Sequence, residues 1–128
     1  MAKIPRHWLR PWCVALLTLA PLAGSAQTPA KAEIAKLIAA LGESDCRFER
    51  NGKWYGPAEA KTHLQRKYEW LNKRDLAATP ELFIERAASA SSISGRPYHV
   101  RCPGQADQAS ADWFRQRLQR LRAAPEGR

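Results

Sequence analysis

Residues 46–55 read Cys46-Arg-Phe-Glu-Arg-Asn51-Gly52-Lys-Trp-Tyr55, and this stretch decides the fold. Asn-Gly is the strongest short signal for a β-hairpin, because both residues of a tight two-residue turn take a positive φ angle. A turn at Asn51 and Gly52 sets three cross-strand pairs, which are Arg50 with Lys53, Glu49 with Trp54, and Phe48 with Tyr55. The sequence therefore predicts a hairpin with a defined register.

The two faces of this hairpin differ in character. Paired residues share a face of a sheet, so Phe48 and Tyr55 point to the core together with Cys46. Trp54 falls on the opposite face beside Glu49. An indole in that position is either covered by a helix or left free for a ligand.

A third strand is expected at 98–102, where Tyr98, Val100 and Cys102 alternate onto one face. An isolated hairpin is only marginally stable, so a third strand paired with residues 46–50 would complete a minimal sheet. That pairing would also bring Cys46 and Cys102 together.

The remaining segments show helical periodicity and helix caps. A first apolar stripe, with a spacing of three or four residues, predicts a helix that follows a frayed lead-in at 27–32 and ends at Gly42. Later helices are expected from Pro57 through Trp70 to Arg74, from Pro80 after a Thr79 cap, and from a Ser110 cap onward. The fold class is thus α+β, with three or four helices packed on a short antiparallel sheet.

Residues 1–26 have the order of a secretory signal peptide. Basic residues without acids come first, an apolar run at 12–22 follows, and the small residues Gly24 and Ala26 precede a cleavage point before Gln27. The run is too short for a spanning helix, which needs about 20 residues. We expect one exported domain at 27–128, periplasmic or secreted, with no transmembrane span.

Export determines how the cysteines and the charge are interpreted. Cys13 leaves with the signal peptide, so Cys46 and Cys102 remain as an even pair in a compartment that permits a disulfide; two buried free thiols are the alternative. Cleavage also removes three of the 21 basic residues and none of the 12 acidic ones, which lowers the net charge from +9 to +6. A basic domain suits an acidic envelope protein, a glycan or an anionic lipid. Nucleic acid is not expected outside the cytoplasm.

The chain resembles domain of unknown function 5329, a family of small exported bacterial proteins. The resemblance covers nearly the whole of 27–128 and is carried by several short motifs: Cys46-x-Phe48-x-Arg50-Asn51-Gly52-x-x-Tyr55, His63-Leu64-x-x-Lys67-Tyr68, Phe83-Ile84-x-x-Ala87, Ser91-Ser92-x-Ser94-Gly95-x-Pro97-Tyr98-x-x-x-Cys102 and Ser110-x-x-Trp113. Ala90 and Arg96 depart from this pattern, since lysines are common at both positions. The resemblance implies export and a shared fold, and it implies no particular activity.

Basic and aromatic residues of the hairpin form the first candidate site. Arg50, Lys53 and Trp54 suit an acidic ligand or an acidic protein surface, with Trp54 as an aromatic contact. Arg96 follows the serine-rich segment 91–94, which could surround an anion or could simply serve as a connector at a helix end. No cofactor and no metal are expected, because His63 and His99 lack ligand spacing. The favoured function is a non-enzymatic binding or accessory domain.

A small serine-type hydrolase is the alternative. His63 and Lys67 lie one helical turn apart and could act as a base and a cation beside Ser92 or Ser94. No acidic residue is evidently placed to orient His63, as the third member of such a group normally does. The two functions differ in a testable way, because only the hydrolase requires a serine hydroxyl next to His63.

Overall fold

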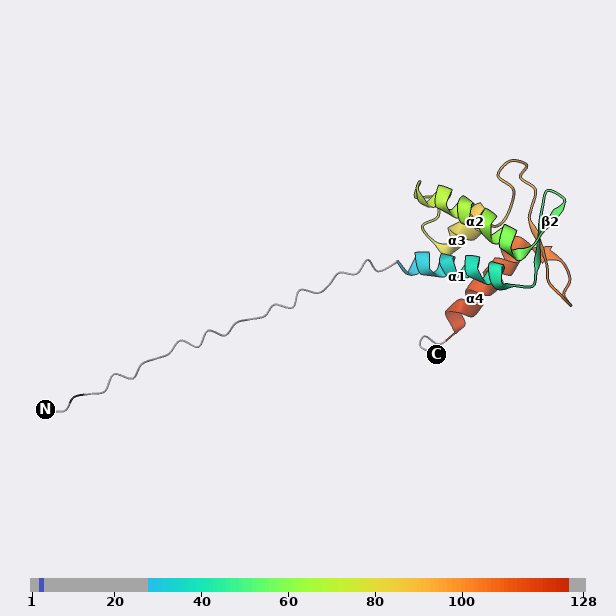
Figure 1. Cartoon of the computed structure of the whole chain (residues 1–128). Coiled ribbons are helices and arrows are strands. Elements are labelled where there is room, and N and C mark those ends of the chain that lie inside the picture. Colours follow the sequence, from blue (N-terminus) through green and yellow to red (C-terminus); the bar gives the residue numbers. More distant parts are fainter. Residues whose placement is uncertain (1–2, 4–27, 125–128) are drawn as a thin grey trace.

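The computed structural model describes Lys3 and residues 28–124, and it shows helices stacked against one end of a small sheet (Figure 1). The predicted signal peptide lies outside the described residues, apart from Lys3. The elements are α1 (Pro29–Glu43), β1 (Arg47–Arg50), β2 (Lys53–Tyr55), α2 (Pro57–Asn72), α3 (Pro80–Ala87), β3 (His99–Arg101), β4 (Gln108–Ala109) and α4 (Ser110–Ala123). The α+β class is confirmed.

The sheet is antiparallel, with the strand order β2-β1-β3-β4. The hairpin has the predicted register, so Arg50 pairs with Lys53 and Phe48 with Tyr55. Asn51 and Gly52 take φ angles of 51° and 81°, which is the positive φ that this turn demands. The hairpin prediction is therefore confirmed down to its turn residues.

The third strand also lies where it was expected. Phe48 of β1 faces Val100 of β3, and the disulfide between Cys46 and Cys102 joins the chain just before β1 to the chain just after β3. The short strand β4 was not predicted. It pairs with β3 through His99 and Ala109, and at two residues it is too short for an alternating pattern to be visible in the sequence.

Four helix boundaries differ from the prediction; among them, α1 ends at Glu43 rather than Gly42, and α2 ends at Asn72 rather than Arg74. The lead-in at 27–32 was wrong, because α1 already begins at Pro29, where the Thr28 hydroxyl accepts a hydrogen bond from the backbone N–H of Lys31 at 3.3 Å. Proline suits the first turn, since its missing N–H has no partner there in any case. Ser110 is the first residue of α4 rather than its cap, and its own backbone N–H donates to the carbonyl oxygen of Tyr98 at 2.9 Å.

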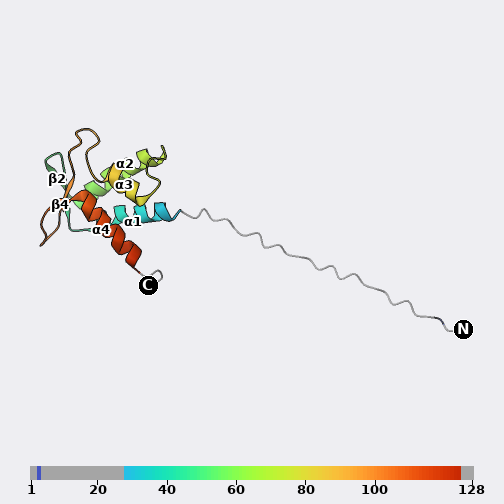
Figure 2. The ribbon, with the colours of Figure 1, turned by 180° about the vertical axis from the view of Figure 1, so that it is seen from behind.

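The hydrophobic core lies between the helices and one face of the sheet. In Figure 2 the helices are seen from behind, with α1 between α2 and α4, and α1 contacts α2, α3 and α4. The predicted stripe of α1 is buried, namely Ile34, Leu37, Ile38 and Leu41. Phe83 links the helices further, because its ring lies 5.8 Å from that of Tyr68 and 6.1 Å from that of Phe114. Among the described residues, no helix is both long enough and apolar enough to cross a membrane.

Candidate functional site

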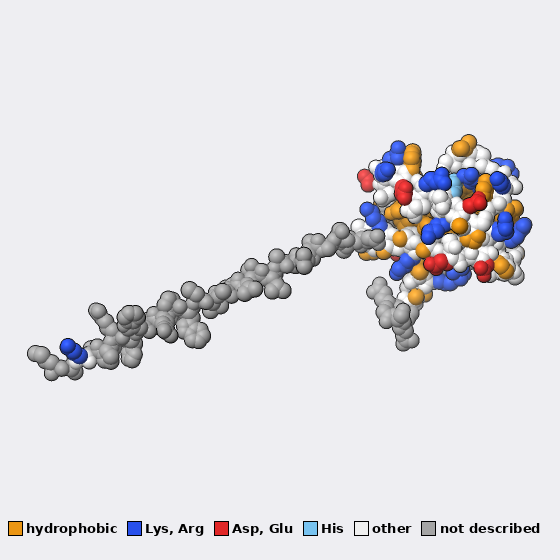
Figure 3. Space-filling model, viewed as in Figure 1, with side chains coloured by type: hydrophobic (Ala, Val, Ile, Leu, Met, Phe, Trp, Pro, Cys, Tyr) orange, Lys and Arg blue, Asp and Glu red, His pale blue; other side chains and the backbone are white. Residues whose placement is uncertain are grey.

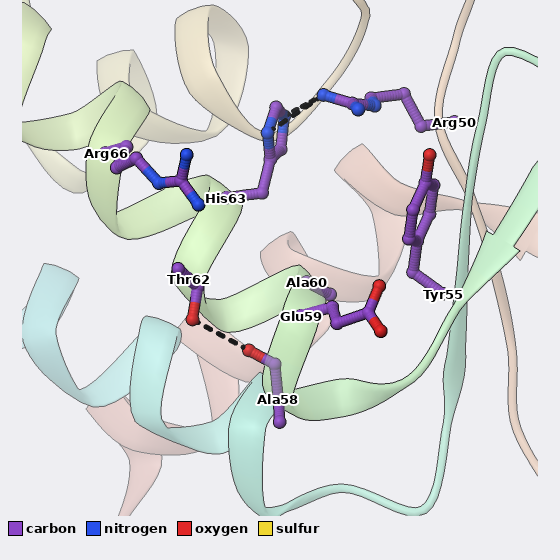
Figure 4. Close-up of a pocket in the computed structure, with 8 residues that line it drawn as sticks. All are labelled: Arg50, Tyr55, Ala58, Glu59, Ala60, Thr62, His63 and Arg66. Atoms are coloured by element: carbon purple, nitrogen blue, oxygen red, sulfur yellow. Dashed lines mark hydrogen bonds between the residues drawn. The ribbon is translucent and has the colours of Figure 1, made fainter.

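A hollow of about 430 Å³ separates the hairpin from the first half of α2 (Figure 4). It is lined by Arg50, Tyr55, Ala58, Glu59, Ala60, Thr62, His63 and Arg66. Helical spacing places Glu59, His63 and Arg66 on one side of α2, while strand alternation places Arg50 and Tyr55 on the face of the hairpin that meets this helix. The hollow is thus built from two elements that are adjacent in the sequence.

Arg50 and His63 meet across this hollow. The guanidinium Nη1 atom of Arg50 lies 3.0 Å from the Nδ1 atom of His63, as Figure 4 shows. A guanidinium can only donate, so Nδ1 is the acceptor and the ring of a neutral His63 carries its proton on Nε2. That N–H donates to the hydroxyl of Tyr98, 3.3 Å away. Nη1 of Arg50 also lies 3.4 Å from Nε2, so it is the shorter contact with Nδ1 that favours this tautomer of His63.

The electrostatics of the site keep His63 uncharged at neutral pH. Burial is the main cause that lowers the pKa of His63 from 6.5 to about 4, and the positive charges of Arg50, Lys67 and Arg66 lower it further. A protonated His63 would add a fourth positive charge to those of Arg50, Lys67 and Arg66.

Burial and neighbouring positive charge also affect Lys67. Burial first, and then the charge of Arg50, lower the pKa of Lys67 from 10.5 to about 8. Its ammonium group donates to the hydroxyl of Tyr98 at 3.2 Å and to the carbonyl oxygen of Ala90 at 3.1 Å. Tyr98 therefore receives hydrogen bonds from both His63 and Lys67.

A second hollow, of about 360 Å³, continues along α2 toward its C-terminal end. Its lining comprises His63, Arg66, Lys67, Trp70, Leu71, Arg86 and Ser92. His63 and Arg66 belong to both hollows, so the two spaces meet at these side chains. Figure 3 shows basic side chains gathered on this side of the molecule, over α2 and the hairpin, with hydrophobic atoms between them.

The cations of the two hollows form no salt bridges with acidic side chains among the described residues. Within residues 28–124, the salt bridges lie elsewhere, as in Arg101 with Asp107 and Arg122 with Glu33, and Arg50, Arg66 and Lys67 take part in none of them. Within the same range, no group of three or more histidine, cysteine or acidic side chains is arranged to hold a metal ion. The arrangement suits an anion, which would complement the charge.

Comparison with known proteins places this chain in a family. A family model described as a family of unknown function, DUF5329, matches residues 28–122, from the cap of α1 almost to the end of α4. The chain belongs to this family. A relative, the "Uncharacterized protein YfeK" of Salmonella typhimurium strain LT2, is 38% identical over 86 residues, which are 66% of this chain and 70% of the relative. No solved structure matches the chain.

In this member of the DUF5329 family, the predicted hairpin residues lie on two different faces. The guanidinium of Arg50 and the amine of Lys53 both lie 5.4 Å from the ring centroid of Tyr55. Trp54 is on the opposite face of the sheet, where the guanidinium of Arg101 stacks 4.1 Å from its ring centroid. Arg50 and Lys53 are therefore brought together, and Trp54 is separated from them.

The serine-rich segment forms a hydrogen-bonded turn against the hairpin. The Ser94 hydroxyl donates to Oδ1 of Asn51 at 2.6 Å, and Nδ2 of Asn51 donates to the Ser91 hydroxyl at 3.4 Å. Arg96 follows on this segment, with its backbone N–H donating to the Ser94 hydroxyl at 3.3 Å. Ser92 is exposed and lines the second hollow.

The side chains next to His63 are not those that the hydrolase hypothesis requires. Among the described residues, the hydrogen-bond partners of His63 are Arg50 and Tyr98, and no serine is among them. Ser92 shares a hollow with His63, and Ser94 is engaged with Asn51 instead.

Sequence reasoning missed several residues of the site, among them Glu59, Arg66 and the hydroxyl of Tyr98. Arg66 lies three residues after His63, a spacing that puts both side chains on one side of a helix, and this signal was available in the sequence. Tyr98 was assigned to the core, and its ring is indeed buried, but its hydroxyl reaches both His63 and Lys67. Strand alternation indicates the face on which a tyrosine ring lies, and it does not reveal which residues the hydroxyl contacts.

Proposed function

We propose that this chain is an exported, non-enzymatic binding domain, and that it holds an anionic ligand in the hollow between Arg50, His63 and Arg66. The observation that carries the proposal is the contact of the Arg50 guanidinium with a neutral His63 at 3.0 Å, in a hollow whose cations have no carboxylate partner in a salt bridge among the described residues. An anionic group there would accept hydrogen bonds from both arginines.

Glu59 sets a limit on the shape of the ligand. Its carboxylate lines the same hollow on the side away from Arg66, and Figure 4 shows it directed toward Tyr55. An anion that approached Glu59 would be repelled, whereas a hydroxyl group could donate to it. The hollow therefore favours a ligand with an anionic group near Arg66 and a neutral polar part near Glu59, as in an acidic sugar.

Export is part of the proposal and rests on the sequence and on the disulfide. Residues 1–26 have the composition of a signal peptide, and Cys46 and Cys102 are joined in a bond that persists in oxidising compartments. The ligand is accordingly one that is found outside the cytoplasm.

A titration followed by NMR tests the binding site. Inorganic phosphate, citrate and glucuronate are added in turn to the purified protein at low ionic strength, while the ring resonances of His63 are recorded. We expect a saturable shift with at least one of the three, strongest for glucuronate. The shift is lost in Arg50→Gln and kept in Arg115→Gln, which changes an exposed arginine on α4. Unmoved His63 resonances with all three anions would contradict the proposal.

The hydrolase alternative has less support from the geometry and can be tested separately. Nucleophilic catalysis by serine needs a base within hydrogen-bond reach of its hydroxyl and usually a third group to orient that base. The group that orients His63 here is a cation, Arg50, which opposes the positive charge that a base acquires. We expect no labelling of Ser92 or Ser94 by a fluorophosphonate probe. Labelling that disappears in His63→Gln would favour the enzyme instead.

A further inference from the structure

Two large hydrophobic side chains of the described part of the chain are exposed to solvent. Ile93 is 98% exposed, in the loop between α3 and β3, and Trp70 is 54% exposed, on α2. Burial of a side chain of this kind is worth about 1.5–3 kcal/mol, so full exposure forgoes a substantial stabilisation. Such exposure calls for a partner when the side chains lie together beside other binding features.

Trp70 and the loop that carries Ile93 border the same hollow. Trp70 lines the second hollow directly, and Ser92, the neighbour of Ile93, lines it from the loop. Figure 3 shows hydrophobic atoms projecting at two points along one edge of the molecule, over the C-terminal end of α2 and over the α3–β3 loop. The loop that carries Ile93 and the side chain of Trp70 therefore contribute to the lining of one hollow.

Basic residues surround this apolar pair. Arg66, Lys67 and Arg86 line the hollow together with Trp70, and its lining contains no acidic residue. The guanidinium of Arg74 stacks on the Trp70 ring, 3.8 Å from its centroid. The exposed hydrophobic side chains on this surface are therefore accompanied by basic residues.

The loop that carries Ile93 is held in shape by hydrogen bonds. The Ser91 hydroxyl accepts from the backbone N–H groups of Ile93 and Ser94, each at 3.3 Å, and the N–H of Gly95 donates to the Ser91 carbonyl oxygen at 2.9 Å. The Ser94 hydroxyl also donates a hydrogen bond to Asn51 of the hairpin. Ile93 is thus presented outward by a bonded turn, so little entropy is lost when it enters a partner.

We propose that this docking face, made of Trp70, Ile93, Arg66, Lys67 and Arg86, attaches the protein to the surface of an anionic phospholipid bilayer. A bilayer offers acidic headgroups above an apolar interior, which is the arrangement that the docking face complements. Ile93 enters the acyl region, Trp70 lies at the headgroup level where indoles are enriched, and the three cations contact phosphates.

The docking face is a better match for a bilayer than α4, the other basic helix. Arg122 of α4 is engaged by Glu33 and Glu81, and Arg117 lies over the ring of Trp113. Ile93 and Trp70 do not line the hollow at Arg50, so the apolar contacts of bilayer docking lie outside the ligand site proposed there. Because Arg66 belongs to both hollows, docking would hold the ligand site close to the membrane surface.

Sedimentation with lipid vesicles tests this proposal. We expect the purified protein to sediment with vesicles of phosphatidylcholine and phosphatidylglycerol, to remain in solution with phosphatidylcholine alone, and to be released by high salt. Ile93→Ser and Trp70→Ser should each lower the partition coefficient about tenfold, from the loss of one buried apolar side chain. Trp54→Ser, on the opposite face of the sheet, is the matched control and should bind as the unmodified protein does.

Three results would overturn the proposal. They are equal sedimentation with neutral vesicles, unchanged sedimentation of both Ile93→Ser and Trp70→Ser, and complete release by soluble glycerol phosphate, which would indicate a headgroup pocket instead of a surface. Both substituted side chains are exposed, so the variants should fold, and circular dichroism checks that they do. Failure here leaves the His63 titration unaffected, and failure of that titration leaves the vesicle result standing.

Discussion

The Nη1 atom of Arg50 lies 3.0 Å from Nδ1 of His63, so the imidazole of this protein is oriented by a cation. In most sites where a histidine acts as a base, a carboxylate or carbonyl oxygen accepts its Nδ1 proton. Here the proton is on the other nitrogen and is donated to Tyr98. A neutral His63 therefore accepts a hydrogen bond from Arg50 and donates one to Tyr98, while cations surround it.

The first prediction concerns the pKa of His63 itself. Arg50→Gln removes one of the charges that lower this pKa from 6.5 to about 4, so the pKa should rise while burial still holds it below 6.5. An NMR pH titration of the ring protons measures the change. Arg115→Gln serves as the control and should leave the titration of His63 where it was. A His63 pKa that stays at about 4 in Arg50→Gln would show that the charge of Arg50 does not contribute to it.

The second prediction is a pH dependence of stability. Because the pKa of His63 is lower in the folded than in the unfolded state, the unfolded state binds more protons between pH 6.5 and about 4. The stability that His63 contributes is therefore complete above pH 6.5 and is lost as the pH falls toward 4. We expect the free energy of unfolding to decline less steeply over this range in His63→Gln. Urea titrations at several pH values give the slopes, and equal slopes in both proteins would contradict the assignment.

The hairpin was predictable because it follows from short-range chemistry, and the disulfide was predictable because the hairpin needs a third strand and export leaves an even pair of cysteines. Asn51-Gly52 demands a tight turn, the turn sets the register, and the register determines which residues share a face with Phe48. Pairing of the third strand then brings Cys46 to Cys102. The turn and its register use only neighbours in the sequence and the period of a strand, whereas the pairing of the third strand was inferred from the marginal stability of an isolated hairpin.

The site was predictable only in part, because it depends on how α2 meets the sheet. Arg50 and His63 were each singled out from the sequence, yet they were placed in different hypotheses, and nothing in their spacing indicates that they meet. Trp54 was grouped with Arg50 as a ligand contact, although the predicted register already assigned the two side chains to opposite faces. The distance between a helix and a hairpin is set by core packing, and that information is spread over the whole chain.

The third prediction gives the contribution of the disulfide. Cys46 and Cys102 are separated by 56 positions, and the chain-entropy model assigns about 4 kcal/mol to the closure of a loop of that length. The double variant Cys46→Ala with Cys102→Ala should lose about this much free energy of unfolding, measured by urea titration. The reduced natural protein is the control and should lose a similar amount. A loss below about 1 kcal/mol would mean that the core of this small domain is sufficient without the bond.

The fourth prediction tests export and the disulfide in the cell. Protein recovered from the cell envelope should have a mass that begins at Gln27, and it should take up two alkyl groups only after reduction. The proposal of export has signal peptidase remove residues 1–26 with Cys13, and the remaining two cysteines are bonded in the structure. Mass spectrometry before and after alkylation measures both points. An uncut chain would contradict export, whereas thiols that alkylate without reduction would contradict the Cys46–Cys102 bond in the cell and with it an oxidising location.

The fifth prediction links the hairpin turn to the docking face through Asn51. Its backbone has a φ angle of 51°, which glycine adopts freely, so Asn51→Gly should keep the hairpin. The substitution removes the side-chain bonds to Ser91 and Ser94, which are what hold the loop of Ile93 against the hairpin. We expect faster amide hydrogen exchange at 92–95 and a severalfold weaker sedimentation with anionic vesicles, a smaller loss than in Ile93→Ser because the isoleucine is still present. Thr62→Ala, which removes a hydroxyl bonded within α2, is the control and should change neither measurement. If Asn51→Gly loosens the loop and leaves vesicle binding intact, the presentation of Ile93 does not depend on a pre-formed turn, and the affinity of the docking face comes from its composition alone.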